Sequence, residues 1–248
     1  MTELEIVVLG VGDAFSTRHR PASFLICCDR RLVAVDCPDM YRAALARAER
    51  LSGRALPLGS IQDFILTHVH GDHIGGVEGV GFYKHFVEKT RPTLITTPEV
   101  RAVIWDRRLA VGMGRLWDGQ RFVERTFEDY FLFRPVQPEQ PTTVGPITIS
   151  VRSTIHHVPT FALLASAGGR TLGYSADTAF DQGLIDFLAP ADLIIHETNL
   201  GPAHTPYSRL RQLPGPIRDR MRLIHYPDDF DAATSAIRCL REGEIVRV

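Results

Sequence analysis

Cysteine is scarce in this chain, and its spacing excludes the common cysteine-based sites. The four cysteines are Cys27, Cys28, Cys37 and Cys239. They form neither a Cys-x-x-Cys metal motif nor the framework of a disulfide-rich secreted protein. We therefore expect reduced, mostly buried cysteines in a cytoplasmic protein, and no cysteine among the ligands of a metal.

Long apolar runs, a secretion signal and an excess of one charge are also missing. No run approaches the roughly 18 apolar residues of a membrane-spanning helix, and the first residues lack a basic region followed by an apolar core. The formal net charge is −1, which gives no reason to expect nucleic acid as the partner. These absences argue against secretion and membrane insertion, and they favour a small-molecule substrate.

The patterns that are present alternate between strand and helix. Apolar runs and alternation predict strands at residues 4–9, 23–28, 32–35, 147–151, 161–166, 171–174 and 193–195. A helix is predicted after the strand at residues 32–35, because apolar residues recur at helical spacing from Pro38 onward. Ile74–Val87 is also compatible with a helix. Periodicity alone predicts a mixed α and β fold. Composition shows no break, and length alone does not choose between one large domain and two small ones. We expect one domain over residues 1–248.

One short loop concentrates groups that bind metal. His68, His70, Asp72 and His73 lie within six residues, directly after the apolar run Phe64–Leu66 that predicts a buried strand. Imidazole and carboxylate are groups that Zn²⁺, Mn²⁺ and Fe²⁺ favour. The loop therefore indicates a metal site. The alternative is a solvated histidine-rich loop, or histidines that only cap the following helix.

The same loop resembles a motif of a known family. His68-x-His70-x-Asp72-His73 after a strand, with Thr67 before it and Gly75-Gly76 after it, is similar to the second motif of the metallo-β-lactamase fold hydrolases. The resemblance implies an α/β (α+β) fold, a four-layer αββα sandwich with two β-sheets face to face and helices outside. The nearest branch is that of ribonuclease Z and the cyclic phosphodiesterases.

Three further residues match family positions at predicted strand ends. Asp36 resembles the first motif, which supports the metal loop from behind; the alternative is a helix-start residue. Asp177 ends a hairpin strand as the fourth motif does, and it would bridge two ions, since two close cations need an anion between them. His225 follows the short apolar segment Met221–Ile224 as the last family ligand does. The alternatives are a helix cap for Asp177 and a buried, backbone-bonded histidine for His225.

His156 and His157 compete for one ligand position. Neighbouring side chains on an extended segment point to opposite faces, so one of them is expected to reach the metal. In the phosphodiesterase branch the ligand precedes an x-Val/Ile-Pro pattern, and His156-His157-Val158-Pro159 fits with His156 in the ligand place. We therefore favour His156, and we expect His19, His85 and His157 not to be ligands.

The resemblance then implies a complete site with two divalent ions. Its ligands are His68, His70 and His156 for the first ion, Asp72, His73 and His225 for the second, and Asp177 for both. Zinc is the favoured metal, with manganese and iron as alternatives. Asp72 and Asp177 would hold the attacking water in line.

His204 and Glu197 resemble catalytic elements of the ribonuclease Z branch. His204-Thr205-Pro206 stands where that branch has His-Ser-Thr, and His196-Glu197-Thr198-Asn199 stands where it has His-Glu-Ala-Thr. In that branch the first histidine protonates the leaving oxygen, a task that suits imidazole. The alternative is a surface histidine. Because Pro206 departs from the pattern and no long basic arm is evident, a small or cyclic phosphodiester is favoured over tRNA.

Rival functions remain within the same fold. The chain could hydrolyse a lactone or thioester, or it could be an iron-dependent redox protein, although di-iron members typically have Glu where this chain has His70. A homo-oligomer is expected. The aromatic-rich segment from Trp105 to Tyr130 either fills the core or covers a substrate pocket, and core filling is favoured.

Overall fold

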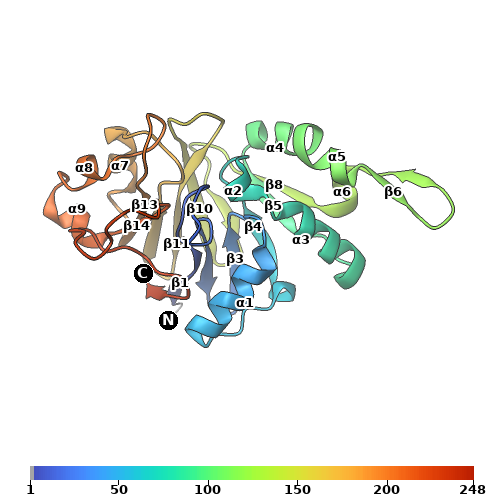
Figure 1. Ribbon diagram of the computed structural model, residues 1–248, viewed down its shortest axis with the longest axis horizontal. Coiled ribbons are helices and arrows are strands. Elements are labelled where there is room, and N and C mark those ends of the chain that lie inside the picture. The colour runs from blue at the N-terminus through green and yellow to red at the C-terminus, as the bar shows by residue number, and fades with distance from the viewer. Residues whose placement is uncertain (1–2) are drawn as a thin grey trace.

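Two β-sheets packed face to face form the centre of the protein, with helices on both outer sides (Figure 1). The computed structural model describes residues 3–248. Figure 1 shows α7, α8 and α9 on one side of the sheets and α1 and α3 on the other. The predicted αββα sandwich is thus confirmed.

The first sheet is antiparallel at one end and parallel at the other. In spatial order its strands are β15 (Ile245–Arg247), β1 (Leu4–Gly10), β2 (Ser23–Cys28), β3 (Arg31–Val35), β4 (Ile61–Ile65), β5 (Thr93–Thr96) and β8 (Leu132–Pro135). From β3 to β8 neighbours run parallel, so their carboxyl ends meet at one edge of the sheet.

The second sheet has the same mixed character. In spatial order its strands are β14 (Met221–Ile224), β13 (Leu193–Glu197), β12 (Arg170–Tyr174), β11 (Phe161–Ala167), β10 (Ile147–Ser153) and β9 (Thr142–Val144). Here β12, β13 and β14 are parallel to one another. Three adjacent carboxyl ends are therefore brought together in this sheet as well.

The helices are short apart from α1. They are α1 (Tyr41–Ser52), α2 (Gly71–Ile74), α3 (Val77–Tyr83), α4 (Pro98–Ile104), α5 (Ala110–Met113), α6 (Phe127–Tyr130), α7 (Gln182–Leu188), α8 (Tyr207–Leu210) and α9 (Gly215–Arg220), with a 3₁₀ turn η1 (Leu58–Ser60) and two π-helical turns, η2 (Lys84–Glu88) and η3 (Trp105–Leu109). None of the helices in residues 3–248 is both long enough and apolar enough to cross a membrane.

Strand β1 shows why its sheet is covered on both faces. Ile6 and Val8 join the core between the two sheets, whereas Val7 and Leu9 join a second core under the helices of the first sheet. Successive side chains of a strand point to opposite faces, so a run that is apolar at every position requires two apolar layers. The sequence thereby specifies an interior strand.

Two local features differ from the sequence expectation. The helix predicted from Pro38 starts at Tyr41, because Met40 adopts a left-handed backbone with φ 55° that a helix cannot contain. The predicted helix Ile74–Val87 is divided into α2, α3 and the π-helical turn η2.

The aromatic segment Trp105–Tyr130 is divided between two environments. Phe127 and Tyr130 are buried under the first sheet, as core filling predicts. Trp117 and Phe122 are exposed and in edge-to-face contact on the hairpin of β6 (Arg115–Trp117) and β7 (Phe122–Glu124). This hairpin projects from the body of the molecule (Figure 1).

Candidate metal centre

The carboxyl ends of parallel strands from both sheets carry the polar residues of the centre. The strands β3, β4, β12, β13 and β14 are followed by, or end in, Asp36, the loop from Thr67 to His73, Asp177, Glu197 and His225. Each of these strands has a pattern of apolar residues, and the pattern ends before the polar residue that belongs to the centre. These strand ends supply five separate parts of the site, and His156, after β10, and His204 come from two further segments.

Three of these strand ends contain a residue with left-handed backbone. Asp36, Ala176 and His225 have φ values of 60°, 49° and 58°. This conformation is uncommon for residues with a side chain, although Asp and His tolerate it better than most. At each strand end it turns the chain sharply, and the turn lies at or next to a residue of the centre.

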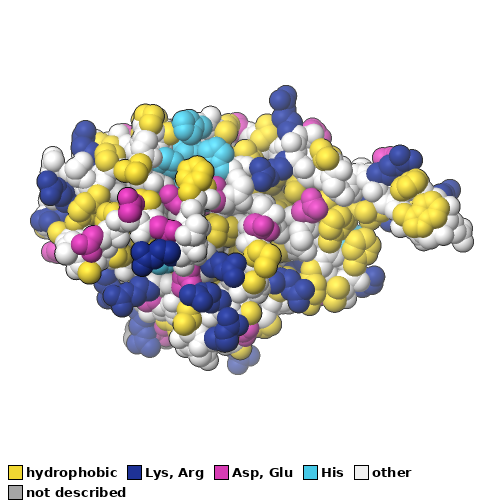
Figure 2. Space-filling model, viewed as in Figure 1, with side chains coloured by type: hydrophobic (Ala, Val, Ile, Leu, Met, Phe, Trp, Pro, Cys, Tyr) yellow, Lys and Arg dark blue, Asp and Glu magenta, His cyan; other side chains and the backbone are white. Residues whose placement is uncertain are grey.

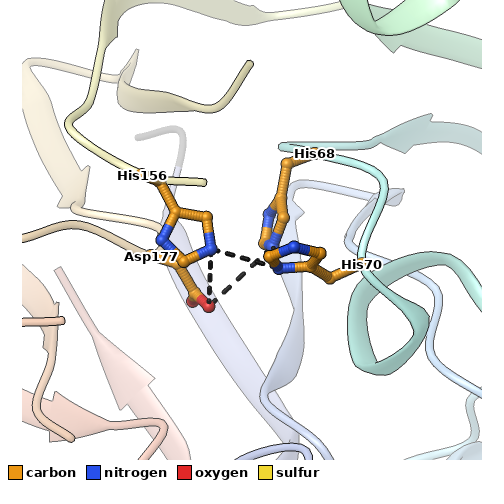
Figure 3. Close-up of side chains that lie close together, drawn as sticks. All are labelled: His68, His70, His156 and Asp177. Atoms are coloured by element: carbon orange, nitrogen blue, oxygen red, sulfur yellow. Dashed lines mark hydrogen bonds and ion pairs between the residues drawn. The ribbon is translucent and has the colours of Figure 1, made fainter. Parts of the chain in front are cut away.

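The first group of candidate ligands consists of three histidines and a carboxylate. His156 Nε2 lies 3.1 Å from His70 Nδ1, and His68 Nε2 lies 3.2 Å from the same atom. The Asp177 Oδ2 atom is 3.7 Å from His156 Nε2 and 3.8 Å from His68 Nε2. Figure 3 shows the four side chains converging from separate segments. All donor atoms lie within 4.8 Å of one another.

The second group shares Asp177 with the first. His73 Nε2 is 3.3 Å from Asp177 Oδ1 and 3.4 Å from Asp72 Oδ2. His225 Nε2 is 3.2 Å from Asp72 Oδ2 and 3.5 Å from Asp177 Oδ2. The structure thus brings together all seven residues predicted as ligands, with Asp177 between the two groups.

Unpaired buried atoms show that these residues fit metal ions. Among residues 3–248, His73 Nε2 and Asp177 Oδ1 are buried and make no hydrogen bond. Leaving such atoms unpaired costs about 1–3 kcal/mol each. Nitrogen and carboxylate oxygen are also the donors that divalent transition metals prefer. A cation between these atoms would satisfy both.

The structure separates His156 from its neighbour. His156 turns into the first group, and its Nδ1 lies 3.0 Å from the carbonyl oxygen of Ala203, which fixes the ring. His157 is exposed and lies outside the groups of candidate ligands. The two other histidines expected not to be ligands are also elsewhere: His19 packs edge-on against Tyr226, and His85 Nδ1 is 3.2 Å from the Asp129 carbonyl oxygen.

Burial sets the protonation of the first group. It lowers the pKa of His68 well below the usual imidazole value, lowers that of His70, and lowers that of His156 to about 4. These rings are therefore neutral at neutral pH, and neutral imidazole is the form that binds metal.

The second group behaves differently. Burial acts to lower the pKa of His73 and His225, but the surrounding carboxylates together raise both pKa values: Asp177 and Asp36 act on His73, and Asp177, Asp72 and Glu197 act on His225. For Asp72, burial acts to raise the pKa, but the hydrogen bonds with His225 and His73 hold it below its ordinary value. A metal ion would compete with protons in this group.

Asp36 holds the metal loop from behind. Its Oδ1 accepts hydrogen bonds from the Thr67 backbone nitrogen at 2.9 Å and the Thr67 hydroxyl at 3.0 Å, and its Oδ2 lies 2.8 Å from His73 Nδ1. All three residues are buried. The contact with Nδ1 leaves Nε2 of His73 directed at the second group, which is the arrangement that the first-motif resemblance implies.

Replacing Asp36 by asparagine is expected to weaken metal binding about 10–100-fold, the usual cost of losing such a supporting carboxylate. Asparagine keeps the side-chain shape and tolerates the left-handed backbone, so the fold should be retained. Competition with a chromophoric chelator measures the affinity. Asp192→Asn, at an exposed ion pair with Arg170, serves as the control. An unchanged affinity in the Asp36 variant would refute the supporting role.

His204 and Glu197 form a third group beside the shared carboxylate. His204 Nδ1 lies 3.0 and 3.1 Å from the two carboxylate oxygens of Glu197, and 4.0 Å from Asp177 Oδ2. Burial, and then the charge of Asp177, raise the pKa of Glu197 well above its usual value. The His204 ring is therefore held against a buried carboxyl group at the edge of the centre.

A cavity of about 460 Å³ opens over the centre. Its walls include residues of all three groups, namely His70, Asp72, Asp177, His204 and His225, and a set of residues outside them, namely Ala14, Phe15, Gly71, His157, Asn199, Leu200, Gly201, Pro202 and Ala203. Figure 2 shows histidine side chains gathered in one surface patch with apolar side chains beside them. The centre is thus accessible to a small molecule.

Two residues beside this centre had no role in the sequence prediction: Asn199, which contacts His225, and Asp13, which contacts Asn199. The Asn199 side-chain nitrogen lies 3.4 Å from His225 Nδ1 and donates to Asp13 Oδ2 at 3.2 Å. Asp13 follows the first strand and Asn199 follows the β13 strand, so both carry the signal that found Asp36: a polar residue just after an apolar strand.

Comparisons with known proteins agree with this arrangement. A family model described as "Anti-Pycsar protein Apyc1" matches residues 4–244. The Anti-Pycsar protein Apyc1 of Bacillus phage BSP38 is 28% identical over 255 residues, which cover 96% of this chain and 96% of that protein. The cGMP-dependent 3′,5′-cGMP phosphodiesterase A of Dictyostelium discoideum is 26% identical over 255 residues; the match covers 96% of this chain but spans only 27% of that enzyme.

A solved structure gives the same fold. The metallo-β-lactamase fold protein YhfI from Bacillus subtilis superposes with a TM-score of 0.80 at 20% sequence identity, covering 100% of both chains. The metallo-β-lactamase fold predicted from the sequence is therefore confirmed.

Proposed function

Because this chain belongs to the Anti-Pycsar protein Apyc1 family, we propose that it hydrolyses 3′,5′-cyclic nucleotides at a centre with two divalent metal ions. The prediction of a metal-dependent phosphodiesterase is borne out by the relatives, one of which is named as a 3′,5′-cGMP phosphodiesterase. The observation that carries the proposal is the position of Asp177, whose oxygens face both groups of candidate ligands. A single carboxylate in that position suits a pair of ions.

The metal is divalent, and we propose zinc. Two such ions would lower the pKa of a water between them and neutralise charge on the phosphoryl group. The first group, with three neutral histidines, suits zinc well. Asp72 and Asp177 would orient the attacking water, a role supported by the position of both residues at the cavity.

His204 is proposed as the proton donor to the leaving oxygen. Its Nδ1 is occupied by Glu197, so Nε2 is the nitrogen that remains for the substrate. Glu197 is itself fixed by the Thr178 backbone nitrogen at 2.6 Å. Glu197 would therefore orient the ring.

The cavity and the projecting hairpin favour a small substrate over RNA. A volume of about 460 Å³ falls within the range of small-molecule sites. Between Arg115 and Glu124 the hairpin carries two arginines and two acids, which lie as pairs: Arg115 with Glu124 at 3.5 Å and Arg121 with Asp118 at 3.8 Å. A balanced hairpin offers little attraction to a polyanion.

Metal analysis combined with a substrate panel tests the proposal. We expect two equivalents of a divalent metal per chain, turnover of 3′,5′-cyclic nucleotides, and loss of turnover after chelation that added zinc or manganese restores. The panel should include lactones and thioesters. If only these esters are turned over, the protein is a lactone or thioester hydrolase and not a phosphodiesterase. Bound iron with an absorbance that responds to oxygen would favour the redox alternative. The expected homo-oligomer stays a prediction, which sedimentation can test.

A further inference from the structure

The loop between β1 and β2 presents an aromatic ring to solvent beside the centre. Phe15 is 88% exposed, although phenyl groups normally gain free energy by burial, and it lines the cavity over the two groups of candidate ligands. An exposed apolar side chain at a cavity rim is a feature of binding sites.

The loop that carries Phe15 is held at both ends. The Phe15 backbone nitrogen donates to Asp13 Oδ1 at 3.0 Å. Asp228 accepts hydrogen bonds from the Ser16 hydroxyl and from the backbone nitrogen and hydroxyl of Thr17, both at 2.8 Å. Arg18 Nη1 donates to the Asp228 carbonyl oxygen at 2.9 Å. The exposure of Phe15 is therefore built into the loop.

A second exposed apolar residue lines the same cavity from another segment. Leu200 is 71% exposed and follows Asn199, whose Oδ1 accepts from the Leu200 backbone nitrogen at 2.7 Å. Asn199 in turn donates to Asp13 Oδ2. The carboxylate of Asp13, 5% exposed, thus ties the segment of Phe15 to the segment of Leu200.

We propose that Phe15 and Leu200 form an apolar clamp that holds the base of the cyclic nucleotide while its phosphodiester lies at the metal groups. This inference rests on the proposed function and specifies how its substrate is recognised. The clamp requires a flat apolar surface on the ligand, which every nucleobase has. Because stacking on a phenyl ring does not read the edges of a base, we expect purine and pyrimidine cyclic nucleotides to use the clamp alike.

Kinetics of Phe15 variants test the clamp. Phe15→Ala should raise KM for 3′,5′-cyclic AMP and 3′,5′-cyclic UMP about tenfold or more, with kcat changed little, and Phe15→Trp should restore KM. Leu200→Ala should raise KM in the same direction. A cyclic ribose phosphate without a base should have equal KM values in wild type and Phe15→Ala. The matched control is Phe133→Ala, which removes an exposed phenyl ring of β8 outside the cavity.

A binding measurement separates failure of the clamp from failure of the proposed function. In Phe15→Trp the new indole should be quenched by 5′-AMP and not by ribose 5-phosphate, and wild type, with its two tryptophans, provides the background signal. Absence of cyclic nucleotide turnover by wild type would overturn the proposed function, while quenching would still support the clamp. KM values within twofold of wild type in Phe15→Ala, or no quenching in Phe15→Trp, would overturn the clamp.

Discussion

Asp177→Ala is expected to leave the purified protein with at most one divalent ion per chain. The carboxylate of Asp177 is 2% exposed and lies within 4 Å of histidines from both groups, so its loss removes an anion that both ions need. Without it, two cations would face each other with little charge between them. Turnover of cyclic nucleotides should fall below detection. Elemental analysis after dialysis measures the metal content.

Two further variants make the Asp177 result specific. Asp177→Asn keeps the shape of the side chain but removes its charge, and it should also lose an ion. Asp186→Ala, on the outer helix α7, where Asp186 accepts a bond from Gln182, should keep two. Circular dichroism and thermal melting identify any variant that fails to fold. Two full metal equivalents in folded Asp177→Ala would remove Asp177 from the bridging position.

His204→Ala is expected to keep both ions while turnover of cyclic nucleotides falls about 10²–10⁴-fold, the usual contribution of a general acid. His204 belongs to neither group of candidate metal ligands around Asp177, although its donor atom also lies close to those of Glu197 and His225. Unchanged metal content in the variant therefore distinguishes a proton donor from a metal ligand. The leaving oxygen of a cyclic nucleotide is a poor leaving group that needs a proton, whereas p-nitrophenolate does not. The loss should therefore be much smaller with bis(p-nitrophenyl) phosphate.

The contrast between the two substrates is the decisive measurement for His204. Equal losses with both substrates would indicate that His204 positions the metal groups and donates no proton. Unchanged turnover of the cyclic nucleotide would remove it from catalysis. His85→Ala is the matched control, since His85 lies outside the candidate groups and contacts the Asp129 carbonyl oxygen. The Glu197→Gln variant should show the same dependence on leaving group as His204→Ala if Glu197 acts through that ring.

The parts of the centre that could be predicted are those encoded locally. His68, His70, Asp72 and His73 form one motif on one loop, and Asp177 and His225 stand at strand ends that match the family pattern. The contact between Asp13 and Asn199 could not be predicted, because it joins residues 186 positions apart. Asn199 ends the motif His196-Glu197-Thr198-Asn199, but the motif does not indicate Asp13 as its partner. Pairing of that kind depends on how the two sheets pack.

The same reason explains the errors in secondary structure. Apolar spacing located the interior strands well, because strands such as β1, β2 and β3 are almost entirely buried. It placed the start of α1 at Pro38, since the left-handed turn at Met40 leaves no trace in apolar periodicity. It also could not divide Trp105–Tyr130, where a projecting hairpin and a buried helix have equally aromatic sequences.

The pairing of β15 with β1 has a consequence for the order in which the protein matures. Residues 5–7 pair with residues 245–247, so this edge of the first sheet forms only after synthesis has passed residue 247. All four candidate ligands of the first group have been synthesised once the chain reaches Asp177, whereas the second group is incomplete until His225 has been added. A chain on the ribosome could therefore acquire its two ions one after the other. Such late closure also implies slow folding, because contacts between distant segments form last.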